Sequence, residues 1–279
     1  MRNSTNKMVS VIVPVYNRHT LFLKTLRSLI RQDITNFKLE IIVIDDCSTP
    51  SVSKFLTKRY PESLKKIKII RNKKNMGPAL SRNKGISVSK GNYVSFLDSD
   101  DIYKPDFVEE LTSKINFNKS EAAISYMTPL FTGKHSLLNI FFYTSLSLSR
   151  LFCFTYMYFF KKSKLDDSFF YMTRLSGMIF TKKSISNISF SEKYKSAEDW
   201  QFVLKCIIKN NITIKILPTF LVDFRYHKNS ETLGRSGYWN YYYDLINETP
   251  IRMRKKMGIK LFKLYTDFSA LKDTWQKNL

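Results

Sequence analysis

Short apolar runs alternate with longer amphipathic stretches through the first half of the chain. Four runs rich in β-branched residues are apolar enough to be strands covered on both faces: Val9–Val15, Leu39–Asp45, Ile67–Arg71 and Tyr93–Leu97. Between the first two, apolar residues recur at helical spacing over His19–Gln32. This alternation predicts βαβ units, and therefore an α/β fold with a Rossmann-like, mostly parallel sheet flanked by helices.

The ends of the predicted strands are where chemistry is expected, because ligands of open α/β sheets bind beyond the carboxyl ends of the strands. Helices should follow these ends, since Pro50 and Pro78 stand where a first helical turn accepts proline. The strand ends are polar or turn-forming, and two of them carry paired carboxylates: Pro14–Asn17, Asp45–Ser48 and Asp98–Asp101.

The acidic cluster Asp98, Asp100 and Asp101 follows directly on the fourth strand. Several like charges at one sheet edge are costly unless a cation shares them. A hard divalent ion such as Mg²⁺ or Mn²⁺ prefers carboxylate and phosphate oxygens, and could join Asp100 to a diphosphate. The alternative is a solvated acidic turn that caps a helix starting near Pro105, and the motif alone does not separate the two.

The charge of the chain indicates an anionic partner. Lys and Arg number 46 against 23 Asp and Glu, which leaves a formal charge of +23. Phosphorylated substrates, acidic lipid headgroups and nucleic acid all fit such a charge. Nucleic acid is not the expected partner, because the lysines are spread along the chain and there is no arginine-rich arm.

Three features bear on the compartment. Cys47, Cys153 and Cys206 are odd in number and far apart, which fits a reducing cytosol better than a disulfide framework. The polar N-terminus lacks the apolar core of a signal peptide.

Residues 137–160 are long and apolar enough to span a membrane, but Arg150 near the middle would cost about 3 kcal/mol on insertion scales. A span there would also separate the strand-end carboxylates from Glu198 and Asp199, so we expect helices that cover the sheet or rest on a membrane surface.

Five ordered motifs between residues 8 and 230 resemble glycosyltransferase family 2. They are Val11–Asn17, Ile41–Thr49, Asn75–Ile86, Phe96–Asp101 and Ser196–Trp200. The resemblance implies a GT-A fold, a UDP-sugar donor, a Mn²⁺ or Mg²⁺ cofactor and single displacement with inversion at the anomeric carbon. The chain departs from the commonest family pattern at Cys47 and Thr49–Pro50, where little functional consequence is expected.

The resemblance also implies roles for the residues at the strand ends. Pro14, Tyr16 and Asn17 would line the nucleotide pocket, with Tyr16 near the base, although its ring could instead close the sheet edge. Asp46 would hydrogen-bond the uracil or ribose. Its neighbour Asp45 has the alternative of satisfying backbone donors at the strand end.

Family resemblance divides the work of the acidic residues. Asp98 would bind the ribose or metal-bound water, and Asp100 would be the direct metal ligand. Arg82 would face the diphosphate, because a guanidinium pairs with planar oxyanions, unless it is a surface arginine.

Glu198–Trp200 precedes an amphipathic stretch and, as bare chemistry, is a charged helix start favoured by the helix dipole. By resemblance, Asp199 is the general base that takes the proton of the acceptor hydroxyl, an assistance typically worth about 10²–10⁴ in rate.

A C-terminal element, Phe224–Ser230, is similar to one found in many family members. There His227 would reach the metal or diphosphate and Arg225 would assist the diphosphate. The alternative for His227 is a loop histidine without a ligand.

The resemblance fades beyond residue 235, so the chain divides into a catalytic domain over 1–235 and a basic amphipathic helical extension over 236–279. Within the domain, 8–127 would bind the nucleotide sugar and 128–235 the acceptor. In the extension, Leu261, Leu264, Phe268 and Leu271 recur at helical spacing among lysines. This suits a helix at an anionic membrane surface, and packing on the catalytic domain is the alternative.

The sequence therefore predicts an inverting, metal-dependent glycosyltransferase, cytoplasmic and peripheral at the inner face of the cytoplasmic membrane. It would move a hexose or N-acetylhexosamine from a UDP-sugar to a hydroxyl of a glycan or lipid-linked oligosaccharide, in synthesis of a bacterial lipopolysaccharide, capsule or O-antigen. The alternative is a non-catalytic nucleotide or anionic-lipid binding module on the same scaffold, which intact Asp100 and Asp199 argue against. A nucleotidyltransferase would be expected to carry a glycine-rich basic loop after its first strand, where this chain has Pro14–Asn17.

Overall fold

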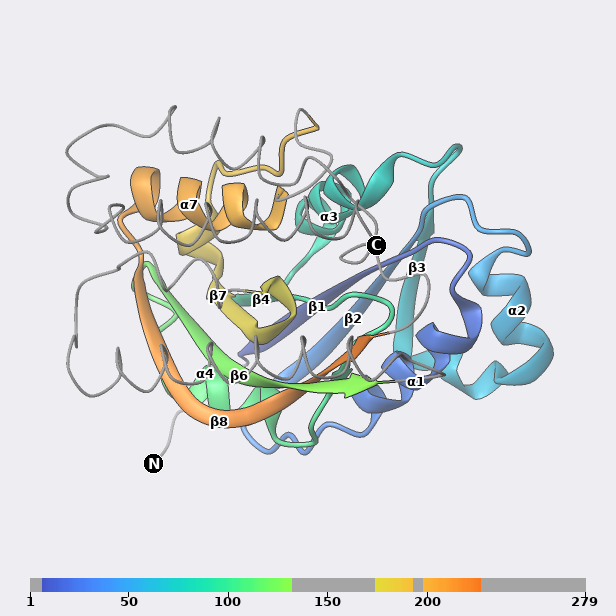
Figure 1. Cartoon of the computed structure of the whole chain (residues 1–279), viewed down its shortest axis with the longest axis horizontal. Coiled ribbons are helices and arrows are strands. Elements are labelled where there is room, and N and C mark those ends of the chain that lie inside the picture. The colour runs from blue at the N-terminus through green and yellow to red at the C-terminus, as the bar shows by residue number, and fades with distance from the viewer. Residues whose placement is uncertain (1–6, 132–173, 193–197, 227–279) are drawn as a thin grey trace, which may run out of the picture.

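The computed structural model describes residues 7–131, 174–192 and 198–226. Within these ranges one sheet of eight strands runs through the molecule in the order β3-β2-β1-β4-β7-β6-β8-β5 (Figure 1). The strands along the chain are β1 (Met8–Val15), β2 (Lys38–Asp45), β3 (Ile67–Arg71), β4 (Tyr93–Phe96), β5 (Ile102–Tyr103), β6 (Glu121–Phe131), β7 (Met178–Thr181) and β8 (Thr213–Tyr226).

Helices cover both faces of this sheet. The α-helices of the described ranges are α1 (His19–Ile30), α2 (Val52–Arg59), α3 (Gly77–Val88), α4 (Phe107–Ser113) and α7 (Glu198–Asn210). The described residues also form three short 3₁₀ helices: η1 (Pro61–Lys66), η2 (Leu175–Gly177) and η3 (Lys182–Ile185). Buried side chains of α1, α2 and α4 pack on one face, and those of α3 and α7 on the other. Figure 1 shows α3 and α7 together on one side of the strands.

The side chains of β1 alternate between the two faces of the sheet, so this strand contributes to the core on each face. Val9, Val11, Val13 and Val15 lie in the core beneath α1, whereas Ile12 lies in the core beneath α3 and α7. Successive side chains of a strand point to opposite faces, so a strand that is apolar at nearly every position can bury both. The prediction of strands covered on both faces is confirmed for β1.

The parallel half of the sheet agrees with the sequence. β3, β2, β1 and β4 are all parallel neighbours, and each lies within one residue of its predicted bounds. Pro78 falls in the first turn of α3, as predicted. Pro50 does not lie in a helical turn: α2 begins at Val52, and the Ser51 hydroxyl caps it by accepting the Lys54 N–H at 3.2 Å. The N-cap serine therefore starts the helix, and the proline precedes it.

The second half of the sheet is mixed. β7 is antiparallel to both β4 and β6, β6 is parallel to β8, and β5 pairs antiparallel with β8. The register of β6 and β8 shifts between Ser125 and Met127, and Figure 1 shows both strands curving along the sheet edge. This curvature brings the end of β8 back to β5, directly after the acidic cluster. The predicted α/β class is confirmed, and the sheet is parallel chiefly in its first half.

No helix of the described residues has the length and apolar character needed to cross a membrane. The apolar stretch 137–160 and the extension 236–279 lie outside the described residues. Cys47 and Cys206 carry free thiols, and burial raises the pKa of the Cys206 thiol to about 12.

Candidate active site

The predicted strand ends meet at one edge of the sheet. The backbone N–H of Asp46 donates to Val15 O at 2.8 Å, and that of Asn17 donates to the Ser48 hydroxyl at 3.1 Å. On the other side of β1, the Leu97 N–H donates to Ile12 O at 3.0 Å. Since β2, β1 and β4 are parallel neighbours, their carboxyl ends place the three motifs side by side.

The turn after β1 is held in an unusual backbone conformation. Asn17 has a φ of 52°, and its side-chain oxygen accepts the Thr49 N–H at 2.7 Å. Asparagine tolerates this left-handed region because its short polar side chain bonds locally. Beside it, Tyr16 is 46% exposed and Pro14 is half-buried, so the Tyr16 ring is accessible at the edge of the sheet. The roles of Pro14, Tyr16 and Asn17 at a nucleotide stay predictions.

Asp45 and Asp46 both hold neighbouring loops. Asp45 accepts the N–H groups of Ser48 and Val52 at 2.9 and 3.1 Å and pairs with Arg71 at 2.5 Å. It therefore satisfies backbone donors at the strand end, which was its alternative role.

Asp46 is 3% exposed and accepts from the Asn72 amide and from the N–H groups of Met76 and Gly77, at 2.7 to 2.9 Å. Gly77 has a φ of 83°, a backbone conformation that favours glycine. Asp46 therefore holds the turn at Met76–Gly77, in which glycine is the preferred residue at position 77. Its predicted contact with uracil or ribose would have to share these bonds.

The acidic cluster forms a compact group of oxygens. One carboxylate oxygen from each of Asp98, Asp100 and Asp101 lies within 4.8 Å of the other two. Asp101 is 1% exposed, and burial, followed by repulsion from Asp100 and Asp98, raises its pKa well above the ordinary value. Among the described residues, no donor reaches its Oδ2 atom. A group of three carboxylates, one of which keeps a buried oxygen without a donor, fits a hard divalent cation that would neutralise their repulsion.

The hydroxyl of Thr25 and the buried guanidinium of Arg225 hold the backbone of the acidic cluster in place. The Thr25 hydroxyl lies 3.0 Å from Ser99 O and 2.7 Å from Asp101 O, and it accepts from Arg225 Nη2 at 2.9 Å. Arg225 is 1% exposed and also donates to the carbonyl oxygens of Asp100 and Leu21. The structure thus places Arg225 as a support for the acidic loop. Its predicted contact with a diphosphate stays a prediction.

Two further arginines neutralise the outer carboxylates. Arg82 Nη2 donates to Asp98 at 2.7 Å, and Arg18 Nη1 donates to Asp100 at 2.6 Å. Arg82 is buried rather than on the surface, and its Nη1 donates to Glu198 at 3.0 Å. Burial alone lowers the pKa of Arg82, but Asp98 and Glu198 outweigh that effect and raise it.

Asp199 stands in the first turn of α7, where a charged helix start was predicted. It is half-buried, and its Oδ1 accepts the Trp200 N–H at 2.8 Å. Burial, then the charge of Glu198, raises the pKa of Asp199 to about 7, against the opposing effect of Arg82. A carboxylate with a pKa near neutrality has the proton affinity that a general base needs.

Arg18 and Glu198 were not among the residues singled out as site members. Glu198 was visible as a charged helix start, but nothing in the sequence tied it to Arg82. Arg18 follows a recognised motif, yet a single arginine before a helix carries no signal of its own. His227 lies outside the described residues.

The sequence profile described as Glycosyl transferase family 2 matches residues 10–173. The chain belongs to glycosyltransferase family 2.

Relatives extend the likeness over most of the chain. An uncharacterized glycosyltransferase of Methanocaldococcus jannaschii is 25% identical over 229 residues, which are 82% of this chain and 74% of the relative. The minor teichoic acid biosynthesis protein GgaB of Bacillus subtilis is 28% identical over 207 residues, which are 72% of this chain but only 21% of that protein.

Solved structures share the fold. S. aureus TarS in complex with UDP-GlcNAc superposes with a TM-score of 0.63 at 22% identity, covering 86% of this chain and 64% of that one. Mannosyltransferase PcManGT from Pyrobaculum calidifontis, in complex with GDP-Man and Mn²⁺, gives a TM-score of 0.57 at 18% identity, covering 81% and 59%. The family 2 fold of the GT-A type, predicted from the motifs, is confirmed.

Proposed function

We propose that this family 2 glycosyltransferase moves a hexose or N-acetylhexosamine from a UDP-sugar to a hydroxyl of a glycan or lipid-linked acceptor, with inversion. The observation that carries the proposal is the continuous network Asp98–Arg82–Glu198, which ends one residue from Asp199. It ties the acidic cluster to the start of α7, where the next residue, Asp199, is a carboxylate whose pKa is about 7. Transfer needs both groups at one site, because the leaving diphosphate and the attacking hydroxyl react at the same carbon.

The chain's residues then have separate tasks. Asp199 takes the proton of the acceptor hydroxyl as that oxygen attacks the anomeric carbon. Asp100, with His227, would hold a Mn²⁺ or Mg²⁺ ion, which when bound neutralises charge on the departing nucleoside diphosphate, and Asp98 would bind the ribose or a water on that ion. Pro14, Tyr16, Asn17 and Asp46 bind the nucleoside end of the donor.

The donor and acceptor classes rest on the relatives. The TarS neighbour holds UDP-GlcNAc and GgaB is named for minor teichoic acid biosynthesis, which supports a UDP-sugar donor and a cell-surface polymer as acceptor. The PcManGT neighbour holds Mn²⁺, which supports a divalent ion at the acidic cluster. The acceptor would enter over the part of the domain that follows residue 127.

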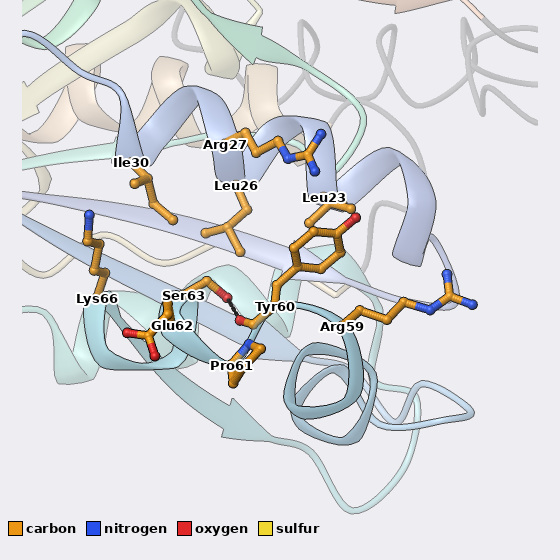
Figure 2. Close-up of a pocket in the computed structure, with 10 residues that line it drawn as sticks. All are labelled: Leu23, Leu26, Arg27, Ile30, Arg59, Tyr60, Pro61, Glu62, Ser63 and Lys66. Atoms are coloured by element: carbon orange, nitrogen blue, oxygen red, sulfur yellow. Dashed lines mark hydrogen bonds between the residues drawn. The ribbon is translucent and has the colours of Figure 1, made fainter.

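We also propose that the enzyme works at an anionic membrane surface, on the cytosolic side. Besides the charge of +23, support comes from a hollow of about 390 Å³ between α1 and η1 (Figure 2). Leu23, Leu26 and Ile30 give it an apolar floor, and the exposed cations Arg27, Arg59 and Lys66 also line it. Among the described residues that line it, the one acid is Glu62, which pairs with Lys65 at 2.9 Å. Apolar contact area beside exposed cations suits lipid headgroups.

The test is turnover with a panel of UDP-, GDP- and dTDP-sugars plus Mn²⁺, following nucleotide release and sugar transfer to candidate polymers. One UDP-sugar should be preferred. Asp199→Asn should retain donor binding and lose transfer, while Asp33→Asn, an exposed control, should behave as the parent. Transfer by Asp199→Asn at the parent rate would remove Asp199 as the base. Donor binding without turnover in the parent protein, on every acceptor, would favour the non-catalytic binding module.

A further inference from the structure

The ion pair of Arg18 with Asp100 occupies the carboxylate that the proposed function gives to a metal. Arg18 Nη1 lies 2.6 Å from Asp100 Oδ2, and the two side chains are 26% and 12% exposed. A carboxylate oxygen that bonds a guanidinium at this distance cannot also bind a divalent cation without bringing two positive groups together.

The backbone of Arg18 is fixed, so its side chain alone can move. The residue directly precedes α1, and its carbonyl accepts the first helical bond, from Phe22 N at 2.8 Å. The preceding Asn17 is bonded to the loop after β2 through both its N–H and its side chain. The main chain of Arg18 is thus fixed beside the acidic cluster, and its side chain can turn by rotation about its own bonds.

The two arginines of the cluster differ in a way that separates their roles. Arg82 is 5% exposed and held between two acids from different elements. Arg18 is 26% exposed and reaches Asp100 from the sheet edge that carries Tyr16 and Asn17. A guanidinium that is almost fully buried stays in place, whereas one that is partly exposed to solvent can exchange its carboxylate for another oxyanion.

We propose that Arg18 is a placeholder cation: it neutralises Asp100 in the free enzyme and turns to the donor's diphosphate when donor and metal bind. This rests on the proposed function. The planar guanidinium suits both partners, since it bonds carboxylate and phosphate oxygens in the same bidentate way. The consequence is coupling: Mn²⁺ alone binds weakly because it competes with Arg18, and UDP strengthens its binding by giving Arg18 another partner.

The test is direct binding rather than activity. Free Mn²⁺ is measured by electron paramagnetic resonance with and without UDP, and UDP binding is measured by calorimetry with Mn²⁺ present. Arg18→Gln should bind Mn²⁺ alone about tenfold more tightly than the parent, and bind UDP in the presence of Mn²⁺ about tenfold more weakly, as expected for the loss of a hydrogen bond between charged groups. Arg31→Gln removes an equal charge from an exposed position beyond the other end of α1 and should change neither value.

Arg18→Lys provides a second variant should Arg18→Gln not fold. It keeps a cation beside Asp100 without the planar fork, so Mn²⁺ alone should still bind weakly while UDP binding falls several-fold. Mn²⁺ binding by Arg18→Gln equal to the parent, or UDP binding by Arg18→Lys equal to the parent, overturns the placeholder role and leaves the transferase proposal standing. Failure of every protein to bind Mn²⁺ or UDP overturns both.

Discussion

The guanidinium of Arg82 donates to Glu198 Oε1 at 3.0 Å, although 116 positions separate the two residues. A second nitrogen of the same group, Nη2, donates to Asp98 Oδ1 at 2.7 Å. One buried cation therefore connects the loop after β4 with the start of α7, and so joins the acidic cluster to the neighbour of Asp199. The network gives Arg82 a structural role in addition to the contact with a diphosphate that its motif predicts.

Replacing Arg82 with Met should destabilise the fold by about 3 kcal/mol, chiefly because Glu198, whose side chain is 14% exposed, would lose its cation in a largely buried setting, whereas Asp98 is 39% exposed and can be solvated. The measurement is urea unfolding at pH 8. Lys65→Met is the matched control, since Lys65 and Glu62 form an exposed pair whose loss should change the free energy of unfolding by less than about 1 kcal/mol. Equal losses in the two variants would mean that the Arg82 network adds nothing to stability.

The rate of transfer at low substrate should depend on the protonation of Asp199. Its pKa is about 7, so kcat/KM should fall about tenfold per pH unit below 7 and level off above it, because only the carboxylate accepts a proton. A flat profile between pH 5.5 and 8.5 would argue against a base with this pKa.

Substitution of Glu198 tests what raises the pKa of Asp199, because it predicts the direction in which the pH profile moves. The charge of Glu198 raises the pKa of Asp199 and that of Arg82 lowers it. Glu198→Gln removes the first effect and leaves Arg82 with one acid fewer, so the acidic limb of the kcat/KM profile should move to lower pH. A limb displaced to higher pH would contradict this assignment.

Removal of divalent ions should abolish transfer, and Mn²⁺ should restore it. Without the ion, the carboxylates of Asp98, Asp100 and Asp101 would repel the negative charge of the diphosphate. Asp100→Asn should raise the Mn²⁺ concentration for half-maximal rate by at least about tenfold. Asp106→Asn, an exposed residue of the following loop, serves as control. Full turnover in EDTA would show that arginines alone neutralise the leaving group.

Binding to membranes should depend on the cations around the hollow between α1 and η1. The triple variant Arg27→Gln, Arg59→Gln and Lys66→Gln should float less with anionic vesicles than the parent, and added salt should weaken both. A variant of equal charge, with Lys68, Lys90 and Lys119 changed to Gln, should float as the parent does. Equal recovery of the two triple variants would show that the hollow does not contact the membrane.

The sequence predicted the parallel half of the sheet and the meeting of its strand ends, because four apolar runs and the polar residues after them follow local rules. It could not place β6 and β8 side by side, since their pairing depends on a long-range register that contains a shift between Ser125 and Met127. The sequence also could not predict which role each side chain of a motif has. Asp45 and Asp46 are adjacent carboxylates, and only the positions of Arg71 and Gly77 separate their tasks.

The bonds of Thr25 have a consequence for engineering of donor choice. Its hydroxyl joins α1 to the acidic loop and to Arg225 at the end of β8, so three segments that are far apart in sequence share one small contact. A graft of residues 98–101 from a relative with another donor would arrive without the helix and strand that shape it. Successful exchange of specificity between such enzymes will require the three segments to be transplanted together.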